Sequence, residues 1–341
     1  MKERTQGRVT ISDVARAAGV SPTTVSHALS GRGQVEARTR ERVLRVAREL
    51  RYRPNRHAQR LRTGEAHMIV LLSSMPFAVA GGSSRLGFLM EIAAVAAGPA
   101  LTNGLALVLA PPLEGGHLPL DALEVDGALV VEPSARDVHV EHMRKRGVPV
   151  VSIGRQAGTR TPVPYVDLRS AFTTRLLLDH LREQGARRIA LLVGSERRTS
   201  YVEGEAEYRA FAAEHRMEPI VAFAEESRGE AGGLAATREL LSRARALDGL
   251  CVPVDAFALG ALQALHEAGR RVPNDTLVAT RYDGMRARTS DPSLTAVDLH
   301  LGQVGEMAIE LLLEHLRGDT TRHMVQAAQP TLVVRRSSKR R

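Results

Sequence analysis

The feature that most constrains this chain is its first 63 residues, which combine an excess of positive charge with short apolar patterns of helical period. They hold 15 of the 47 basic residues and only 5 of the 38 acidic ones. Because the net charge of the whole chain is +9, the rest is close to neutral. A positive charge confined to one end of a near-neutral chain is typical of a nucleic-acid-binding module. A solvated basic tail is the alternative, but it predicts no apolar periodicity.

Residues 9–31 have the pattern of two short helices joined by a tight turn. Thr10 stands where a capping box begins, before an apolar stripe that predicts a helix over Ser12–Ala18. Gly19 ends that helix, because the turn needs a residue that tolerates a positive φ. Pro22 favours the start of the next helix, since the first helical N–H has no partner within the helix. The segment is therefore predicted to be a helix-turn-helix.

The second helix is expected to turn Val25 and Ala28 inward and to leave a polar outer face. A third helix, Glu36–Leu50, completes a small core, so that residues 1–52 form a headpiece. Side chains at the helix starts and on the outer face can reach base edges or phosphates in the major groove. The predicted DNA-contacting residues in the headpiece are Ser12, Ser21, Pro22, Thr23, Thr24, Ser26 and His27.

Residues 53–64 form a short basic segment between two different compositions. Pro54 can start a helix and Gly64 can stop one, which leaves barely two turns between them. A helix this short is marginal in water by itself. The residues alone leave two readings open, a flexible linker and a helix that forms only on a partner.

From His67 onward, short Val/Ile/Leu-rich runs alternate with amphipathic stretches, which favours doubly wound parallel sheets covered on both faces. The predicted strands are His67–Met75, Leu105–Ala110, Gly127–Val131, Val148–Ile153, Arg188–Gly194, Pro219–Ala224, Gly249–Val254 and Thr276–Thr280. The predicted helices are Leu86–Leu101, Val138–Arg146, Ser170–Gln184, Ser200–Glu214, Gly229–Arg245, Ala256–Ala268 and Gln303–Arg317. About 270 residues exceed one such core, so two lobes are expected.

The headpiece sequences VTISDVARAAGVSPTTVSHALSG and RTRERVLRVARELRYRPNRHAQRLRTG resemble the DNA-binding headpiece and hinge of the LacI/GalR family of bacterial transcriptional regulators. Weaker similarity continues through VDGALVV, RGVPVVSIGR and GARRIALLVG. The resemblance implies an α/β fold, in which the headpiece precedes a two-lobed, periplasmic-binding-protein-like (type I) body of parallel sheets. That body is assigned to residues 65–334, with crossovers between the lobes near Val166, Val297 and Val325.

The resemblance also implies roles for residues that contact DNA. Pro22, Thr23 and His27 hold the base-reading positions, and most members have Arg where this chain has His27. The hinge is expected to become helical only on DNA, with Asn55, Ala58, Leu61 and Arg62 in family positions. Leu61 from each chain of a dimer would then wedge into a minor-groove base step.

The function implied is a homodimeric repressor of a palindromic operator, modulated by a small-molecule effector bound in the cleft between the lobes. Ligands of such α/β folds bind at the carboxyl ends of the strands. Two alternatives remain, a solute-binding protein of the transport type and a DNA-binding regulator that has lost its effector response.

The cleft departs from the family pattern at three positions. An Asp, an Arg and an Asn that commonly contact effectors are replaced by Gly154, Gly204 and Val254. We therefore expect that simple hexoses bind weakly or not at all, and that the effector is larger, less polar or absent. The remaining effector-binding candidates are Phe88, Arg155, Asp255, Phe257 and Asp283. Asp255 is equally well read as a helix N-cap, and Asp283 fits the family's binding Asp only with a one-residue shift.

Other functions find little support in the sequence. No phosphate-binding Gly-rich loop, His-Glu-x-x-His motif or Cys/His cluster is present, so neither an enzyme, a metal site nor a cofactor is expected. His139 and His142 lie three apart on a predicted helix, but a solvated face explains them better. Cys251 is expected to be a buried apolar residue.

Two further expectations concern the location of the protein in the cell and its C-terminal tail. No apolar run approaches 18 residues and no signal-peptide core is present, which predicts a cytoplasmic, nucleoid-associated protein that does not enter a membrane. Residues 335–341 are basic and lack apolar side chains, so we expect a disordered, solvated tail.

Overall fold

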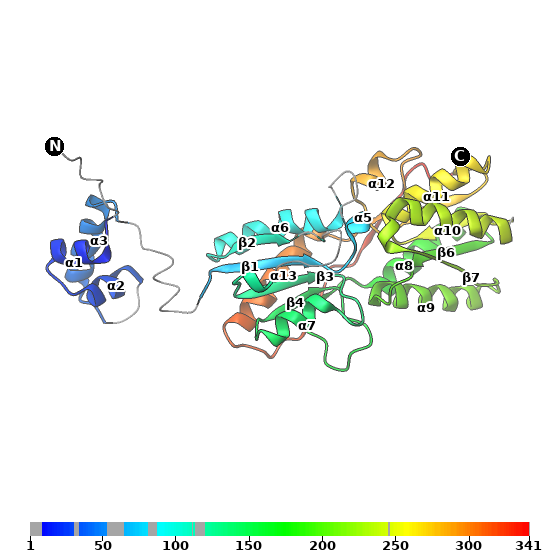
Figure 1. The fold of residues 1–341 in the computed structure, drawn as a ribbon. Helices are drawn as coiled ribbons and strands as arrows, with labels where there is room; N and C mark the ends of the chain where they lie inside the picture. The colour runs from blue at the N-terminus through cyan, green and yellow to red at the C-terminus, as the bar shows by residue number, and fades with distance from the viewer. Residues whose placement is uncertain are drawn as a thin grey trace. The chain divides into compact units, whose positions relative to one another are not determined.

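The computed structural model describes residues 9–30, 34–52, 65–80, 87–110, 112, 120–244 and 246–340. The chain divides into two compact units, residues 1–66 and residues 67–341 (Figure 1). The predicted hinge, residues 53–64, lies outside the described residues. The expectations for Asn55, Ala58, Leu61 and Arg62 therefore remain predictions.

The first unit is a three-helix headpiece, as its sequence pattern predicts. Its helices are α1 (Ile11–Ala18), α2 (Pro22–Ser30) and α3 (Ala37–Glu49). Thr10 and Asp13 form a capping box at the start of α1, and Gly19 ends the helix in the left-handed region at φ +63°. The three helices bury a common core of small and β-branched side chains, namely Val14, Ala15, Ala18, Val25, Ala28, Val43 and Ala47.

The first lobe of the second unit is built on one parallel sheet with strand order β11-β5-β4-β3-β1-β2. Its strands are β1 (Met68–Ser73), β2 (Ala106–Ala110), β3 (Gly127–Val131), β4 (Val150–Ile153), β5 (Tyr165–Asp167) and β11 (Met324–Gln326), and its main helices are α6 (Phe88–Thr102), α7 (Val138–Lys145) and α13 (Leu301–Leu316). Side chains alternate along β1. Ile69 and Leu71 join the core under α6 and α13, whereas Val70 and Leu72 join the core under α7. Both faces of the sheet are therefore covered.

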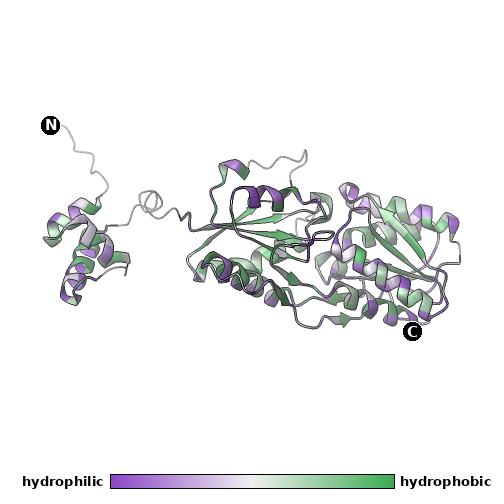
Figure 2. Ribbon diagram, turned by 90° about the horizontal axis from the view of Figure 1, so that it is seen from below, coloured by the Kyte–Doolittle hydropathy of each residue, from purple (hydrophilic) through white to green (hydrophobic). Residues whose placement is uncertain are grey.

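The second lobe repeats this plan on a parallel sheet of order β7-β6-β8-β9. Its strands are β6 (Ile189–Gly194), β7 (Ile220–Ala224), β8 (Gly249–Val252) and β9 (Leu277–Thr280), and its main helices are α8 (Ser170–Glu183), α9 (Thr199–Glu214), α10 (Gly229–Arg243) and α11 (Asp255–Glu267). The backbones of α10 and α11 touch, because a Cβ at Gly260 would lie 2.1 Å from the carbonyl oxygen of Glu230. In Figure 2 the strands of both lobes are apolar and their helices are mixed, as expected for buried sheets.

The predicted elements of this unit are all present, with ends that differ by at most two residues. The chain passes between the lobes after β5, after β10 (Ala296–Asp298) and after β11, which confirms the three expected crossovers. Sequence patterns missed the short helices α5 (Phe77–Ala80) and α12 (Met285–Thr289). They also missed the three-residue strands β5, β10, β11 and β12 (Thr331–Val333), the last of which pairs with β10. Three-residue strands and helices of one turn are too short to show a period, whereas the predicted strands of four or five residues lie within continuous Val/Ile/Leu-rich runs.

The expectation of a disordered, solvated tail is wrong for residues 335–340. Ser337 and Ser338 are fully buried. The Ser337 hydroxyl donates to the carbonyl of Val278 at 2.6 Å and accepts from the backbone N–H of Thr295 at 2.8 Å. The Ser338 hydroxyl bonds His180 Nε2 at 2.7 Å. The two serine hydroxyls thus fix the C-terminal segment to the second lobe by hydrogen bonds with polar groups of that lobe. Because the segment has no apolar residues, its sequence gave no sign of this packing.

Candidate DNA-binding surface and inter-lobe cleft

The helix α2 presents the predicted DNA-contacting face. Ser21 precedes it as N-cap, with its Oγ accepting from the backbone N–H of Thr24 at 3.1 Å and lying 2.9 Å from Thr24 Oγ1. Ser12, Ser21, Pro22 and Thr23 are exposed, whereas Thr24, Ser26 and His27 are half-buried. The inward face is fixed by buried Val25 and Ala28, so the polar face is held outward by the core.

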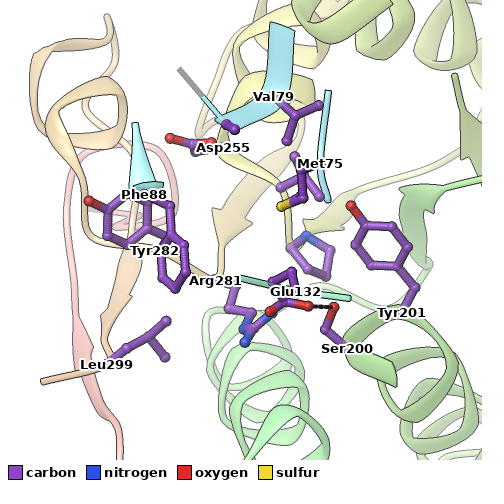
Figure 3. Close-up of a pocket in the computed structure, with 13 residues that line it drawn as sticks. Met75, Val79, Phe88, Glu132, Ser200, Tyr201, Asp255, Arg281, Tyr282 and Leu299 are labelled. Atoms are coloured by element: carbon purple, nitrogen blue, oxygen red, sulfur yellow. Dashed lines mark hydrogen bonds and ion pairs between the residues drawn. The ribbon is translucent and has the colours of Figure 1, made fainter. Parts of the chain in front are cut away.

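A cavity lies between the two lobes of the body, at the carboxyl ends of their strands (Figure 3). The first lobe contributes Met75, Val79, Ala80, Phe88 and Glu132, and the second contributes Ser200, Tyr201, Pro253, Val254, Asp255, Arg281, Tyr282 and Leu299. Several of these residues directly follow β3, β8, β9 and β10. This is the position in which open α/β sheets bind ligands.

Glu132 is the polar centre of this cavity. It is 5% exposed and has a φ of +49°. Its Oε2 accepts from Ser200 Oγ at 2.7 Å, and its Oε1 accepts from Arg281 Nη1 at 3.0 Å. Both partners belong to the other lobe. A Cβ at Gly154 would lie 3.5 Å from the Glu132 carboxyl carbon, so this carboxylate fills space that a side chain at position 154 would use.

A second buried group, Arg198, also joins the lobes. It is 1% exposed and lies 2.6 Å from Glu226 within its own lobe. It donates across the cleft to the backbone carbonyls of Glu132 and Ser74, the latter at 2.7 Å. Although burial disfavours the charged guanidinium, the hydrogen bonds and charge of Glu226 raise the pKa of Arg198. Arg198 therefore stays charged and links Glu226 of the second lobe to backbone carbonyls of the first lobe.

Two of the five predicted effector-binding residues line the cavity. Phe88 meets the ring of Tyr282 edge-on, with 5.2 Å between ring centroids. Asp255 is the first residue of α11, and Val254 rather than Asp255 is its N-cap. One Asp255 oxygen pairs with Arg286 at 3.2 Å. The other is buried without a hydrogen-bond partner among the described residues. Burial raises the pKa of Asp255, while Arg286 opposes that rise.

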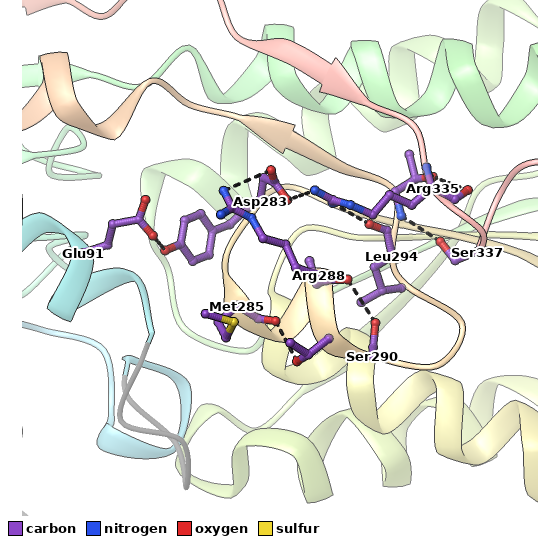
Figure 4. A network of polar contacts seen from close by, with 12 residues as sticks. Glu91, Asp283, Met285, Arg288, Ser290, Leu294, Arg335 and Ser337 are labelled. Carbon is purple, nitrogen blue, oxygen red and sulfur yellow. Dashed lines mark hydrogen bonds and ion pairs between the residues drawn. The ribbon is translucent and has the colours of Figure 1, made fainter.

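The other three predicted effector-binding residues are not in the cavity wall. Arg155 pairs with Glu203 at 2.8 Å on the exposed rim. Phe257 is 0% exposed and belongs to the core of the second lobe. Asp283 is held by Arg335 at 2.6 Å and by Arg288 at 3.3 Å (Figure 4). These two arginines, one of them in the C-terminal segment, pull the carboxylate away from the cavity.

The three positions that depart from the family pattern do not all line the cavity, and the expectation that simple hexoses bind weakly stays a prediction. Val254 lines the cavity without a polar group, but Gly204 packs against α8, where a Cβ would meet Thr174 Oγ1 at 3.0 Å. Polar groups come instead from residues that sequence reasoning missed, namely Glu132, Ser200, Tyr201 and Arg281. Their positions directly after predicted strands, or at the start of a predicted helix, were the available signal.

Comparisons with known proteins agree with both units. A family model described as "Bacterial regulatory proteins, lacI family" matches residues 10–55, and one described as "Periplasmic binding protein-like domain" matches residues 178–338. The HTH-type transcriptional regulator CelR of Thermobifida fusca is 31% identical over 97% of this chain and 98% of its own length. The chain belongs to the LacI family. Like the relatives in this comparison, this LacI-family protein is a DNA-binding transcriptional regulator.

Two of the solved structures that align with 97% of this LacI-family chain illustrate the similarity. A complex of CelR with cellobiose is 30% identical, has a TM-score of 0.70 and is covered completely. The lac repressor dimer bound to operator and the anti-inducer ONPF is 26% identical, has a TM-score of 0.74 and is covered to 99%. These structures support the headpiece-plus-body organisation of this family member.

Metal centres and membrane-spanning helices are absent from the part of the chain that the structure describes. No group of three or more His, Cys, Asp or Glu residues there could hold a metal ion, and no helix there could span a membrane. Cys251 is fully buried, as expected, and burial raises its pKa to about 12.

The ion pair of Arg198 with Glu226 predicts a large difference between two single substitutions. Glu226→Ala leaves a buried guanidinium without its counter-charge and should lower the free energy of unfolding by about 3–5 kcal/mol. Glu203→Ala removes the partner of the exposed Arg155 and should cost less than about 1 kcal/mol. Urea unfolding of the two variants measures both losses, and equal losses would contradict the role given to Arg198.

Proposed function

We propose that this regulator is a homodimeric repressor that binds a palindromic operator and is controlled by a small molecule in the cleft between its lobes. The observation that carries the proposal is the joint presence of an outward-facing α2 and a cavity with a buried Glu132–Arg281 pair at the carboxyl ends of both sheets. The two features assign DNA recognition and effector recognition to separate units of one chain.

On the DNA side, Pro22, Thr23 and His27 are the proposed base-reading residues. A neutral His offers one donor and one acceptor, whereas Arg offers a bidentate fork to guanine, so the operator preference should differ from that of Arg-bearing relatives. Exposed arginines of α3, namely Arg38, Arg42, Arg45 and Arg48, are placed to neutralise phosphates. Asn55, Ala58, Leu61 and Arg62 are the proposed contacts of a hinge that folds on DNA. Such a regulator acts in the cytoplasm, in association with the nucleoid.

On the effector side, the proposal requires a molecule that binds one arrangement of the lobes better than another. Only such a difference in affinity shifts the population between the states that bind and release the operator. Buried polar contacts that cross the cleft, such as those of Glu132 and Arg198, differ between a closed and an open arrangement. They are the contacts through which an effector can act.

A second candidate function, a regulator without effector response, is favoured by one observation. The Glu132 carboxylate already occupies donors of the opposite lobe, so the cavity is partly filled by the chain itself. Against this, Arg281 keeps two buried nitrogen atoms without partners among the described residues, which is costly unless a ligand or water pairs them. We therefore retain the effector-binding function. The headpiece argues against the remaining alternative, a transport-type solute-binding protein.

Operator binding should weaken steeply as salt is raised, because the basic headpieces release counterions from DNA. The logarithm of the binding constant should fall by about 0.9 per neutralised phosphate for each tenfold rise in salt. Genome-wide mapping of bound sites supplies candidate palindromes, and fluorescence anisotropy over a salt series measures the slope. A flat salt response, or random duplex that binds as tightly as every candidate palindrome, would show that the proposed operator recognition is wrong.

Leu61→Ala should weaken specific operator binding by about 1 kcal/mol or more, because the proposed minor-groove wedge is lost. Binding to non-specific DNA should change little, and the bend in the operator should decrease. Leu101→Ala is the control, since Leu101 is 72% exposed on the body and has no part in the proposal. Unchanged affinity and bending in the Leu61 variant would reduce residues 53–64 to a passive linker.

A further inference from the structure

The second lobe already binds a carboxylate, that of Glu132. Ser200 Oγ, at the start of α9, and Arg281 Nη1, directly after β9, each donate to one oxygen of this group. Both donors come from one lobe and the carboxylate comes from the other. Separation of the lobes therefore leaves a site on the second lobe that has lost its carboxylate.

Arg281 has more binding capacity than Glu132 uses. It is 8% exposed, and its Nε and Nη2 atoms are buried without hydrogen-bond partners among the described residues. These two atoms form one edge of the planar guanidinium, and such an edge matches the two oxygens of a carboxylate. A buried edge of this kind in the wall of the cavity, unpaired among the described residues, indicates an acceptor that those residues do not supply.

The rest of the wall restricts the body of the ligand. Met75, Val79, Phe88 and Leu299 face the cavity with apolar surface, and Figure 3 shows them around the Glu132–Arg281 pair. One Asp255 oxygen is the other buried polar atom there that has no hydrogen-bond partner among the described residues. The lining therefore offers a ligand one charged end and a largely apolar wall, and the lobes must separate to admit it, because the cavity volume is only about 50 Å³.

We propose that the effector of this regulator carries a carboxylate group, which takes the place of the Glu132 carboxylate on Ser200 and Arg281. The proposal rests on the proposed effector-binding function and names the chemical class of the ligand. A neutral sugar hydroxyl is a poor replacement, because it leaves the buried guanidinium of Arg281 without a counter-charge. A carboxylate restores the charge and can also use the free edge of Arg281.

Chemical rescue, with acetate as the probe, tests whether a free carboxylate can take the place of the Glu132 carboxylate. Glu132→Gly removes the resident carboxylate and tolerates the positive φ at this position. In the full-length variant, acetate should raise the melting temperature by a few degrees for each tenfold increase above its dissociation constant. Sodium chloride at the same ionic strength and the neutral analogue acetamide are the controls. Equal melting temperatures in acetate, chloride and acetamide would overturn the proposal.

A double variant, Glu132→Gly with Arg281→Met, tells whether the rescue uses the proposed donor. Acetate should no longer raise its melting temperature, and an undiminished rise would overturn the assignment to Arg281. If Glu132→Gly fails to fold, Glu132→Gln is used instead. It keeps the volume of the side chain but competes more weakly with acetate for Ser200 and Arg281. Acetate should then stabilise Glu132→Gln more than it stabilises the unchanged protein, and an equal effect on both would count against the proposal.

Calorimetry with matched pairs of ligands extends the test to larger molecules. Gluconate should bind more tightly than glucitol, which differs by the loss of the carboxylate, and Glu132→Gln should bind gluconate at least threefold more tightly than the unchanged protein. The proposal would be overturned if glucitol bound more tightly than gluconate and bound more weakly to Glu132→Gln than to the unchanged protein. Glu132 would then be an acceptor for sugar hydroxyls. Operator affinity of the unchanged protein is measured in parallel without ligand, so that a failure of the proposed repressor function is seen separately.

Discussion

The closed arrangement of the body depends on buried charge that is shared between its two lobes. Arg198 is paired with Glu226 in one lobe and donates to backbone carbonyls of the other, and Glu132 reaches in the opposite direction to Ser200 and Arg281. A buried charge without a partner is far more costly than an exposed one. The lobes cannot separate without breaking these contacts, so water must replace them in an open form.

This constraint links the cavity to the rest of the body. Arg281 belongs to the same short segment as Tyr282 and Asp283, of which Tyr282 bonds Glu91 of the first lobe and Asp283 is held by Arg335 of the C-terminal segment. A ligand that repositions Arg281 therefore acts on a segment tied to both lobes. Regulation by a small molecule needs such a set of contacts with two alternative arrangements.

Sequence patterns predicted the headpiece and the alternating body closely, because each long element carries its own period and its own start and stop residues. They failed where a contact joins residues far apart in the chain. Nothing near Asp283 indicates that Arg335 will draw it from the cavity, and nothing near Ser337 indicates that backbone groups of Val278 and Thr295 await its hydroxyl. The cleft carboxylate is another such case, because the family pattern places an Asp at position 154, where this chain has Gly. The Glu132 carboxylate takes up that space, which becomes visible only when β3 and β4 lie side by side.

The central claim is that the chain's own buried charges keep the cleft closed without a ligand. The most direct test measures the distance between spin labels at Val138→Cys on α7 and Glu239→Cys on α10, one on each lobe, in full-length protein diluted with unlabelled chain. Cys251 is fully buried and should not react with the label. We expect one narrow, short distance in the ligand-free protein and a broader, longer distribution when Glu132→Gly is added. A broad distribution in the ligand-free protein, or the same distribution in both, would contradict it.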